Sequence, residues 1–135
     1  MGSSNEQKVR IQYLNTDLLL ESESDLHGLA RHFEAADCYA LYLSEDGHHA
    51  GFESGHAPLD STPAQTISML MDVIERLEGQ HLAAWNACTS RELDVGYACG
   101  CEPYSANDLI TSQLLRRMAD AEISLVITLY GLRRD

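Results

Sequence analysis

The sequence predicts a single α+β domain spanning residues 1–135, with one mixed five-stranded sheet and three to four helices packed mainly on one face. Segments in which apolar and polar residues alternate, as in half-buried strands, are separated by segments with apolar residues at helical spacing. A chain of 135 residues also suffices for one sizeable core, and no linker or repeat divides it. The predicted order of elements is β-α-β-β-α-(α)-β-α-β.

The first strand is predicted to begin near Lys8, with a bend or bulge at residues 15–17. A polar, acidic run at residues 21–25 then ends the strand. Ser22 or Ser24 is positioned to accept the free amides at the start of a helix. Apolar residues at helical spacing predict that this helix continues to about residue 36.

Residues 38–54 predict a β-hairpin, because Asp46 and Gly47 form a favoured two-residue turn. The pairs that this turn sets opposite each other are Leu43 with Ala50, Leu41 with Phe52 and Tyr42 with Gly51. The apolar pairs fall on one face together with Tyr39, and Gly51 leaves room for a Tyr42 ring to lie across the partner strand.

The second half of the chain begins with clear sequence signals for the N-terminus of a helix. Thr62 is a capping residue, Pro63 suits the first helical position and Gln65 completes a capping box. Gly79 is predicted to end this helix, and a short further helix is predicted over residues 80–88.

The C-terminal third predicts strand, helix, strand. Apolar residues alternate with polar or small ones over residues 91–99, a helix capped by Ser105 follows, and residues 123–130 are the most continuously apolar β-type segment. Because such runs are typical of strands covered on both faces, we expect the last strand in the middle of the sheet.

Charge is the strongest compositional signal. The chain has 21 acidic and 9 basic residues, a formal net charge of -12, and the excess leans toward the N-terminal half. Such a field repels nucleic acid and anionic membranes and steers a basic protein toward the surface. We therefore expect no nucleic-acid or membrane partner. Acidity that serves solubility alone is the competing interpretation.

Three acidic clusters are candidates for contact with a basic protein partner. The first lies in one connection, the second at the predicted hairpin tip, and the third on one face of a strand. In chain order their members are Glu21, Glu23, Asp25, Glu45, Asp46, Glu92 and Asp94. If these clusters converge in the fold, they form a patch suited to a surface rich in Lys or Arg.

The four cysteines do not resemble a disulfide framework, and we expect free thiols in the cytoplasm. Cys99 and Cys101 are weak candidates for a soft metal, with Cys88 or the histidines at 48 and 49 completing the set. Their one-residue spacing is not that of a structural zinc knuckle. We therefore predict no metal site and no cofactor.

No nucleophile elbow, phosphate loop or dinucleotide motif is present, so we predict no catalytic residue and lean against an enzyme. Two alternatives to a binding protein remain. One is a small ligand-binding domain or enzyme with a pocket near Trp85, Tyr97, Cys99 and Cys101. The other is a structural homodimer formed through an exposed sheet edge or helix face.

No apolar run approaches a membrane span, and residues 1–9 lack the apolar core of a signal peptide, so we expect a cytoplasmic protein. Residues 1–7 are small and polar, and we expect them to be disordered or left over from cloning.

Several short motifs resemble a family of small bacterial proteins known as a domain of unknown function. The motifs lie at residues 15–18, 24–26, 85, 91–97 and 127–130. The resemblance implies one bacterial cytoplasmic domain and transfers no functional residue. Small acidic bacterial domains of this kind have also been proposed as immunity proteins in toxin systems.

Overall fold

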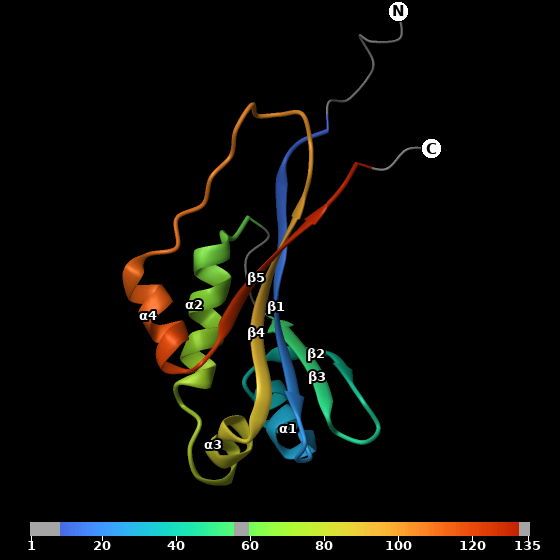
Figure 1. Cartoon of the computed structure of the whole chain (residues 1–135), viewed down its shortest axis with the longest axis vertical. Helices are drawn as coiled ribbons and strands as arrows, with labels where there is room; N and C mark the ends of the chain where they lie inside the picture. Colours follow the sequence, from blue (N-terminus) through green and yellow to red (C-terminus); the bar gives the residue numbers. More distant parts are fainter. Residues whose placement is uncertain (1–8, 56–59, 133–135) are drawn as a thin grey trace, which may run out of the picture.

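The computed structural model describes residues 9–55 and 60–132 and confirms an α+β fold with one mixed five-stranded sheet (Figure 1). In chain order the elements are β1 (Gln12–Ser22), α1 (His27–Ala35), β2 (Cys38–Leu43), β3 (His49–Ser54), α2 (Pro63–Ile74), α3 (Gly79–Asn86), β4 (Cys88–Ala98), α4 (Ser112–Asp120) and β5 (Ser124–Tyr130). This order is the predicted one.

The sheet has the strand order β2-β3-β1-β4-β5. β1 is central and pairs antiparallel with both β3 and β4, while β4 and β5 run parallel and are connected through α4. Two parallel neighbours require such a crossover. The prediction that the last strand lies in the middle of the sheet is wrong, because β5 forms one edge.

The core lies between one face of the sheet and the helices. Leu18 and Leu20 of β1 point into it, as do Leu93 and Val95 of β4, and all four are at most 2% exposed. Helices α1 and α2 supply the opposing side chains, and α1 contributes Phe33, whose ring stacks on that of Phe52 with centroids 4.8 Å apart. β1 and β4 therefore bury alternate side chains on the helix side.

A small hydroxyl network joins β1 to the start of α2. The Tyr13 hydroxyl lies 2.6 Å from both the Thr16 and the Thr66 hydroxyls, and these two lie 3.0 Å apart. Thr66 also donates to the Pro63 carbonyl oxygen at 3.0 Å. Because each hydroxyl in this network has a partner, the core tolerates it without an unsatisfied polar group.

The predicted capping box of α2 is confirmed, but the caps of two other helices are not where the sequence predicted. The Thr62 side chain accepts the Gln65 amide, and the Gln65 side chain accepts the Thr62 amide. Neither Ser22 nor Ser24 caps α1, which follows Leu26 without a side-chain cap. Ser105 does not open the last helix.

Instead, α4 begins at Ser112, and its cap is Thr111, whose hydroxyl accepts the Leu114 amide at 3.1 Å. Residues 99–111 form a connection without helix. Asp108, three residues after Ser105, accepts a hydrogen bond from the Tyr97 hydroxyl at 2.8 Å. This bond ties the connection to β4.

The hairpin register is correct near the turn and shifts beyond it. Leu43 pairs with Ala50 and Tyr42 with Gly51, as predicted, but a bulge between Ala40 and Tyr42 sets Ala40 opposite Phe52. Leu41 is the extra residue of this bulge. The predicted pairing of Leu41 with Phe52 is therefore wrong, and Tyr39 lies on the opposite face from that predicted, across from Glu53.

Gly79 starts α3 rather than ending α2, whose last residue is Ile74. The expectation for residues 1–7 lies outside the described residues. Within the described ranges, no helix is long and apolar enough to cross a membrane.

Candidate acidic binding face

One face of the sheet is lined by carboxylates and is not covered by any of the four helices of the described residues (Figure 1). Because side chains alternate along a strand, the neighbours of the buried leucines and valines point to this face. Five acidic residues occupy it, from β1, β3 and β4: Asp17, Glu21, Glu53, Glu92 and Asp94. We call this set the acidic face.

The centre of the acidic face is a row of three carboxylates on neighbouring strands. Asp17 of β1 pairs directly with Asp94 of β4, and the pairing of Leu18 with Phe52 sets Asp17 beside Glu53 on the other side. Neighbouring strands lie about 4.8 Å apart, so the three charges are close. The strand residues on this face include no Lys or Arg.

The electrostatic consequence appears at Asp17. Partial burial, together with the negative charges of Glu53 and Asp94, raises the pKa of Asp17 from 3.8 to about 6. Its polar contacts are slight, since the Asn15 amide donates to it at 3.3 Å. Asp94 is better satisfied, because the Thr128 hydroxyl donates to it at 2.6 Å. The central carboxylate is thus held close to like charges, and no Lys or Arg of the described strands lies on its face.

Tyrosine rings lie over two glycines of the same face. A Cβ at Gly51 would come within 2.6 Å of the Tyr42 ring, and a Cβ at Gly96 within 3.3 Å of the Tyr130 ring. Each glycine therefore lets a ring lie across the neighbouring strand. Partial burial, followed by the carboxylates of Glu21 and Asp17, raises the pKa of Tyr42. Aromatic rings consequently flank the carboxylates.

The hairpin tip holds a second group of acidic residues. The connection after β1 packs against this tip, since the Leu26 amide donates to the Gly47 carbonyl oxygen at 2.9 Å. Asp25 accepts the His27 amide at 2.8 Å, and Asp46 accepts the Ser44 hydroxyl at 2.7 Å.

These bonds satisfy Asp25 and Asp46 within the chain. Hydrogen bonds from the backbone of His27 and His48 lower the pKa of Asp25 and of Asp46, respectively. Both carboxylates therefore have a local structural task, holding the turns in which they lie. Glu23 and Glu45 are exposed neighbours of this group.

The structure divides the seven predicted partner-binding residues between these two places. Glu21, Glu92 and Asp94 lie on the acidic face, whereas Glu23, Asp25, Glu45 and Asp46 lie at the tip. Sequence reasoning missed Asp17 and Glu53, which complete the row across the strands. The available signal was the alternation of Asp17 and Glu21 with the buried leucines of β1.

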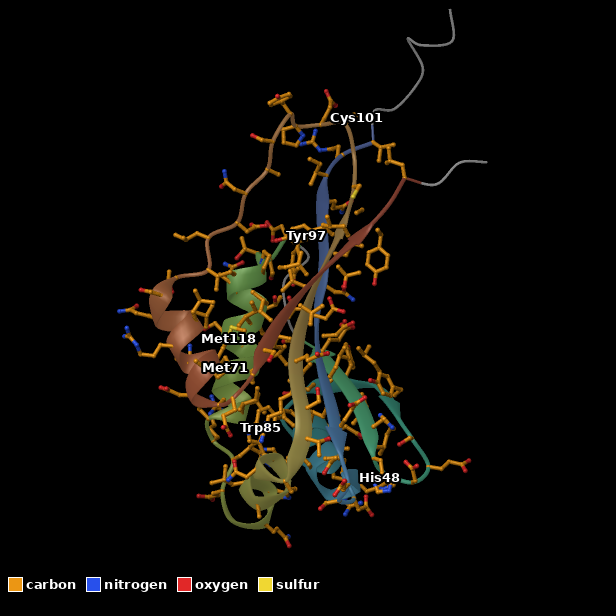
Figure 2. The ribbon with its side chains drawn as sticks, viewed as in Figure 1. His48, Met71, Trp85, Tyr97, Cys101 and Met118 are labelled. Carbon is orange, nitrogen blue, oxygen red and sulfur yellow. The ribbon has the colours of Figure 1, made fainter. Side chains whose placement is uncertain are left out.

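The pocket that the sequence placed near Trp85, Tyr97, Cys99 and Cys101 is present only in part. A pocket of about 310 Å³ lies between β4, β5 and the connection that follows β4, and Tyr97, Cys99 and Ile127 are among its lining residues. Trp85 lies in α3, away from this pocket, and Cys101 lies at the exposed bend beyond it (Figure 2).

The chemistry of this pocket is mainly apolar. The Tyr97 hydroxyl donates a hydrogen bond to Asp108, and burial together with this bond raises the pKa of Tyr97 to about 12. All four cysteines are free. Among the described residues, no group of three or more His, Cys, Asp or Glu side chains is arranged to hold a metal ion.

A second hollow, of about 560 Å³, lies between α1 and α3. His32 and His81 face each other there, with ring centroids 4.8 Å apart. Burial and the neighbouring His81 lower the pKa of His32, so its ring favours the neutral form.

Comparisons with known proteins found no matching family model, curated protein or solved structure. The resemblance to a family of unknown function therefore stays a prediction.

Proposed function

We propose that this protein is a non-enzymatic binding protein whose acidic face binds a basic protein partner, in the manner of an inhibitor or immunity protein. The observation that supports the proposal is the uncompensated carboxylate row formed by Asp17, Glu53 and Asp94 on a sheet face without a helix. The net charge of -12 adds long-range attraction for the same partner.

Electrostatics explain why a cation fits this row. Ionised carboxylates on neighbouring strands repel one another, and the raised pKa of Asp17 records that repulsion together with partial burial. A guanidinium or ammonium group placed among them converts repulsion into attraction. Binding of a cationic side chain therefore removes the repulsion among these carboxylates, which makes the free energy of binding more favourable.

The surroundings of the row favour arginine over lysine. Guanidinium groups bind carboxylates through two parallel hydrogen bonds and also stack on aromatic rings. The acidic face offers both, because the Tyr42 and Tyr130 rings lie across Gly51 and Gly96 beside the carboxylates. We therefore propose a partner surface rich in Arg.

The proposal is tested by capture of partners from a lysate of the source organism at low and at high salt. The bait is compared with the triple variant Asp17→Asn, Glu53→Gln, Asp94→Asn, which neutralises the row. A basic protein that is retained stoichiometrically at low salt, released at high salt and lost with the triple variant supports the proposal.

The matched control neutralises three exposed acids of the helix layer, Glu34→Gln, Glu78→Gln and Asp120→Asn, and so changes the net charge by the same amount. We expect the control to retain the partner. Equal loss in both variants would show that net charge alone drives capture, and retention by the row variant would exclude the acidic face.

A second candidate function is the binding of a small apolar molecule in the pocket lined by Tyr97, Cys99 and Ile127. Its volume of about 310 Å³ lies at the lower end of the range for ligand sites. A fragment screen followed by NMR shift mapping tests it. Saturable shifts at these residues support the candidate, and binders that map elsewhere exclude it.

A further inference from the structure

The position of β5 conflicts with its sequence. Ser124–Tyr130 contains no charge and no proline, the composition of a strand covered by protein, yet β5 lies at the edge of the sheet. On the helix side its three apolar residues, Leu125, Ile127 and Leu129, are 40%, 54% and 65% exposed. No other strand of the described residues pairs with its outer edge.

The same three residues also carry the unpaired backbone groups. The Tyr130 carbonyl oxygen accepts the Cys99 amide on the β4 side. Within a strand, the N–H and C=O groups of one residue point to the same side, and those of the next residue point to the other. Leu125, Ile127 and Leu129 therefore direct both groups to the open edge.

The absence of charge on β5 indicates which kind of partner strand can pair with this edge. A basic partner has nothing to pair with on the uncharged β5, whereas a second copy presents the same uncharged, apolar strand. The nearest acids of the acidic face are Glu92 and Asp94, one strand inward. In an edge-to-edge pair, these acids lie three strand spacings, about 14 Å, from their counterparts, which exceeds the screening length in physiological salt.

We propose that β5 is a self-association surface, at which two copies of this chain pair antiparallel about a two-fold axis at Ile127 to form one continuous sheet. This arrangement sets Leu125 opposite the second copy's Leu129 and pairs the two Ile127 residues. All three pairs lie on the helix side, where apolar cross-strand pairs stabilise a sheet. The interface is isologous, as in most dimers.

Sedimentation equilibrium from low micromolar to several hundred micromolar concentration tests this assignment. We expect a reversible monomer–dimer equilibrium that tightens as salt rises, because salt screens the repulsion between two chains of net charge -12. The dimer uses no residue of the acidic face, so its salt dependence is opposite to that of basic-partner binding. A monomer at every concentration would overturn the assignment.

Two variants with the same added charge locate the interface. Ile127→Lys places an ammonium group at the proposed axis, and we expect it to weaken dimerisation by about tenfold or more. Leu41→Lys makes the equivalent change at the opposite sheet edge, on β2, and should dimerise like the wild type. Loss with Leu41→Lys and not with Ile127→Lys would place the interface elsewhere.

Hydrogen exchange of the wild-type protein gives a measurement that needs no variant. The amides of Leu125, Ile127 and Leu129 should exchange rapidly in dilute solution and become protected at high concentration. Rates that do not change with concentration would contradict pairing at this edge, even if the protein dimerises.

Discussion

Asp17 illustrates how one side chain can oppose folding and favour binding. Its carboxylate lies between Glu53 and Asp94, and partial burial removes part of the water that would otherwise screen the three charges. The fold tolerates this arrangement because the helix side of β1 is filled with well-packed leucines. Functional surfaces commonly carry such local conflicts.

A stability prediction follows from the pKa of Asp17. A pKa raised to about 6 means that the protonated carboxyl favours the fold, a contribution that is present below about pH 4 and lost as pH rises through 6. We expect Asp17→Asn to raise the free energy of unfolding by about 1 kcal/mol at pH 7.5, a value reduced for solvent screening of a half-buried group.

Urea denaturation at pH 7.5 and pH 4 measures this change. The gain should vanish at pH 4, and the control Glu34→Gln, at an exposed site on α1, should show no comparable gain at either pH. Destabilisation by Asp17→Asn at pH 7.5 would contradict the repulsion that we infer.

Binding of a cation should release protons. At pH 6 the Asp17 carboxyl is about half protonated, and a guanidinium beside it favours the ionised form. Calorimetric titration with an oligo-arginine peptide, in buffers of different ionisation enthalpy, should therefore show release of roughly half a proton at pH 6 and almost none at pH 8. Proton uptake at pH 6 would contradict this account.

At the scale of elements, local signals were predictable and pairing between distant segments was not. The Thr62 cap of α2 depends on residues within one helical turn, and the sequence placed it correctly. Ser105 and Thr111 both satisfy the same local rule, but the structure uses Thr111, and the connection before it is tied to β4 by the hydrogen bond between Tyr97 and Asp108. The position of β5 is a property of the whole sheet.

In the candidate site, too, the local pattern was predictable and the pairing of distant strands was not. Glu92 and Asp94 were predictable as a pair because they alternate along one strand. Asp17 and Glu53 become their neighbours only when β1 inserts between β3 and β4. Single-strand patterns contain no information about which strands are adjacent, so the row itself could not be predicted.

Arg117 joins α4 to the C-terminal end of α2 through ion pairs. Its guanidinium lies 2.7 Å from a Glu75 oxygen and 2.9 Å from an Asp72 oxygen. The hydrogen bond from Arg117 lowers the pKa of Glu75. This contribution to stability is present above the ordinary pKa of a glutamate and is lost as pH falls through the lowered value.

We expect Arg117→Met to lower the free energy of unfolding by about 1 kcal/mol at pH 7 and by less at pH 3. The control Arg116→Met, at the exposed neighbouring position, should have a smaller effect. Thermal unfolding followed by circular dichroism at both pH values measures the difference. An equal loss of stability in both variants would show that the Arg117 ion pairs contribute nothing to the free energy of unfolding.

At the scale of the whole molecule, two surfaces of different chemistry lie on one sheet. The acidic face covers β1, β3 and β4 on the side away from the helices, and the uncharged β5 forms an edge. Salt should weaken partner binding at the face and strengthen pairing at the edge. The two proposals can therefore succeed or fail independently.

The most direct test of the central claim is an NMR titration of the isotope-labelled protein with an oligo-arginine peptide. The account predicts saturable shifts at Asp17, Glu53, Asp94 and their strand neighbours. These shifts should be lost at high salt and in the row variant but kept in the helix-layer control. Shifts centred on the tip carboxylates, or unchanged in the row variant, would contradict a cation-binding role for the acidic face.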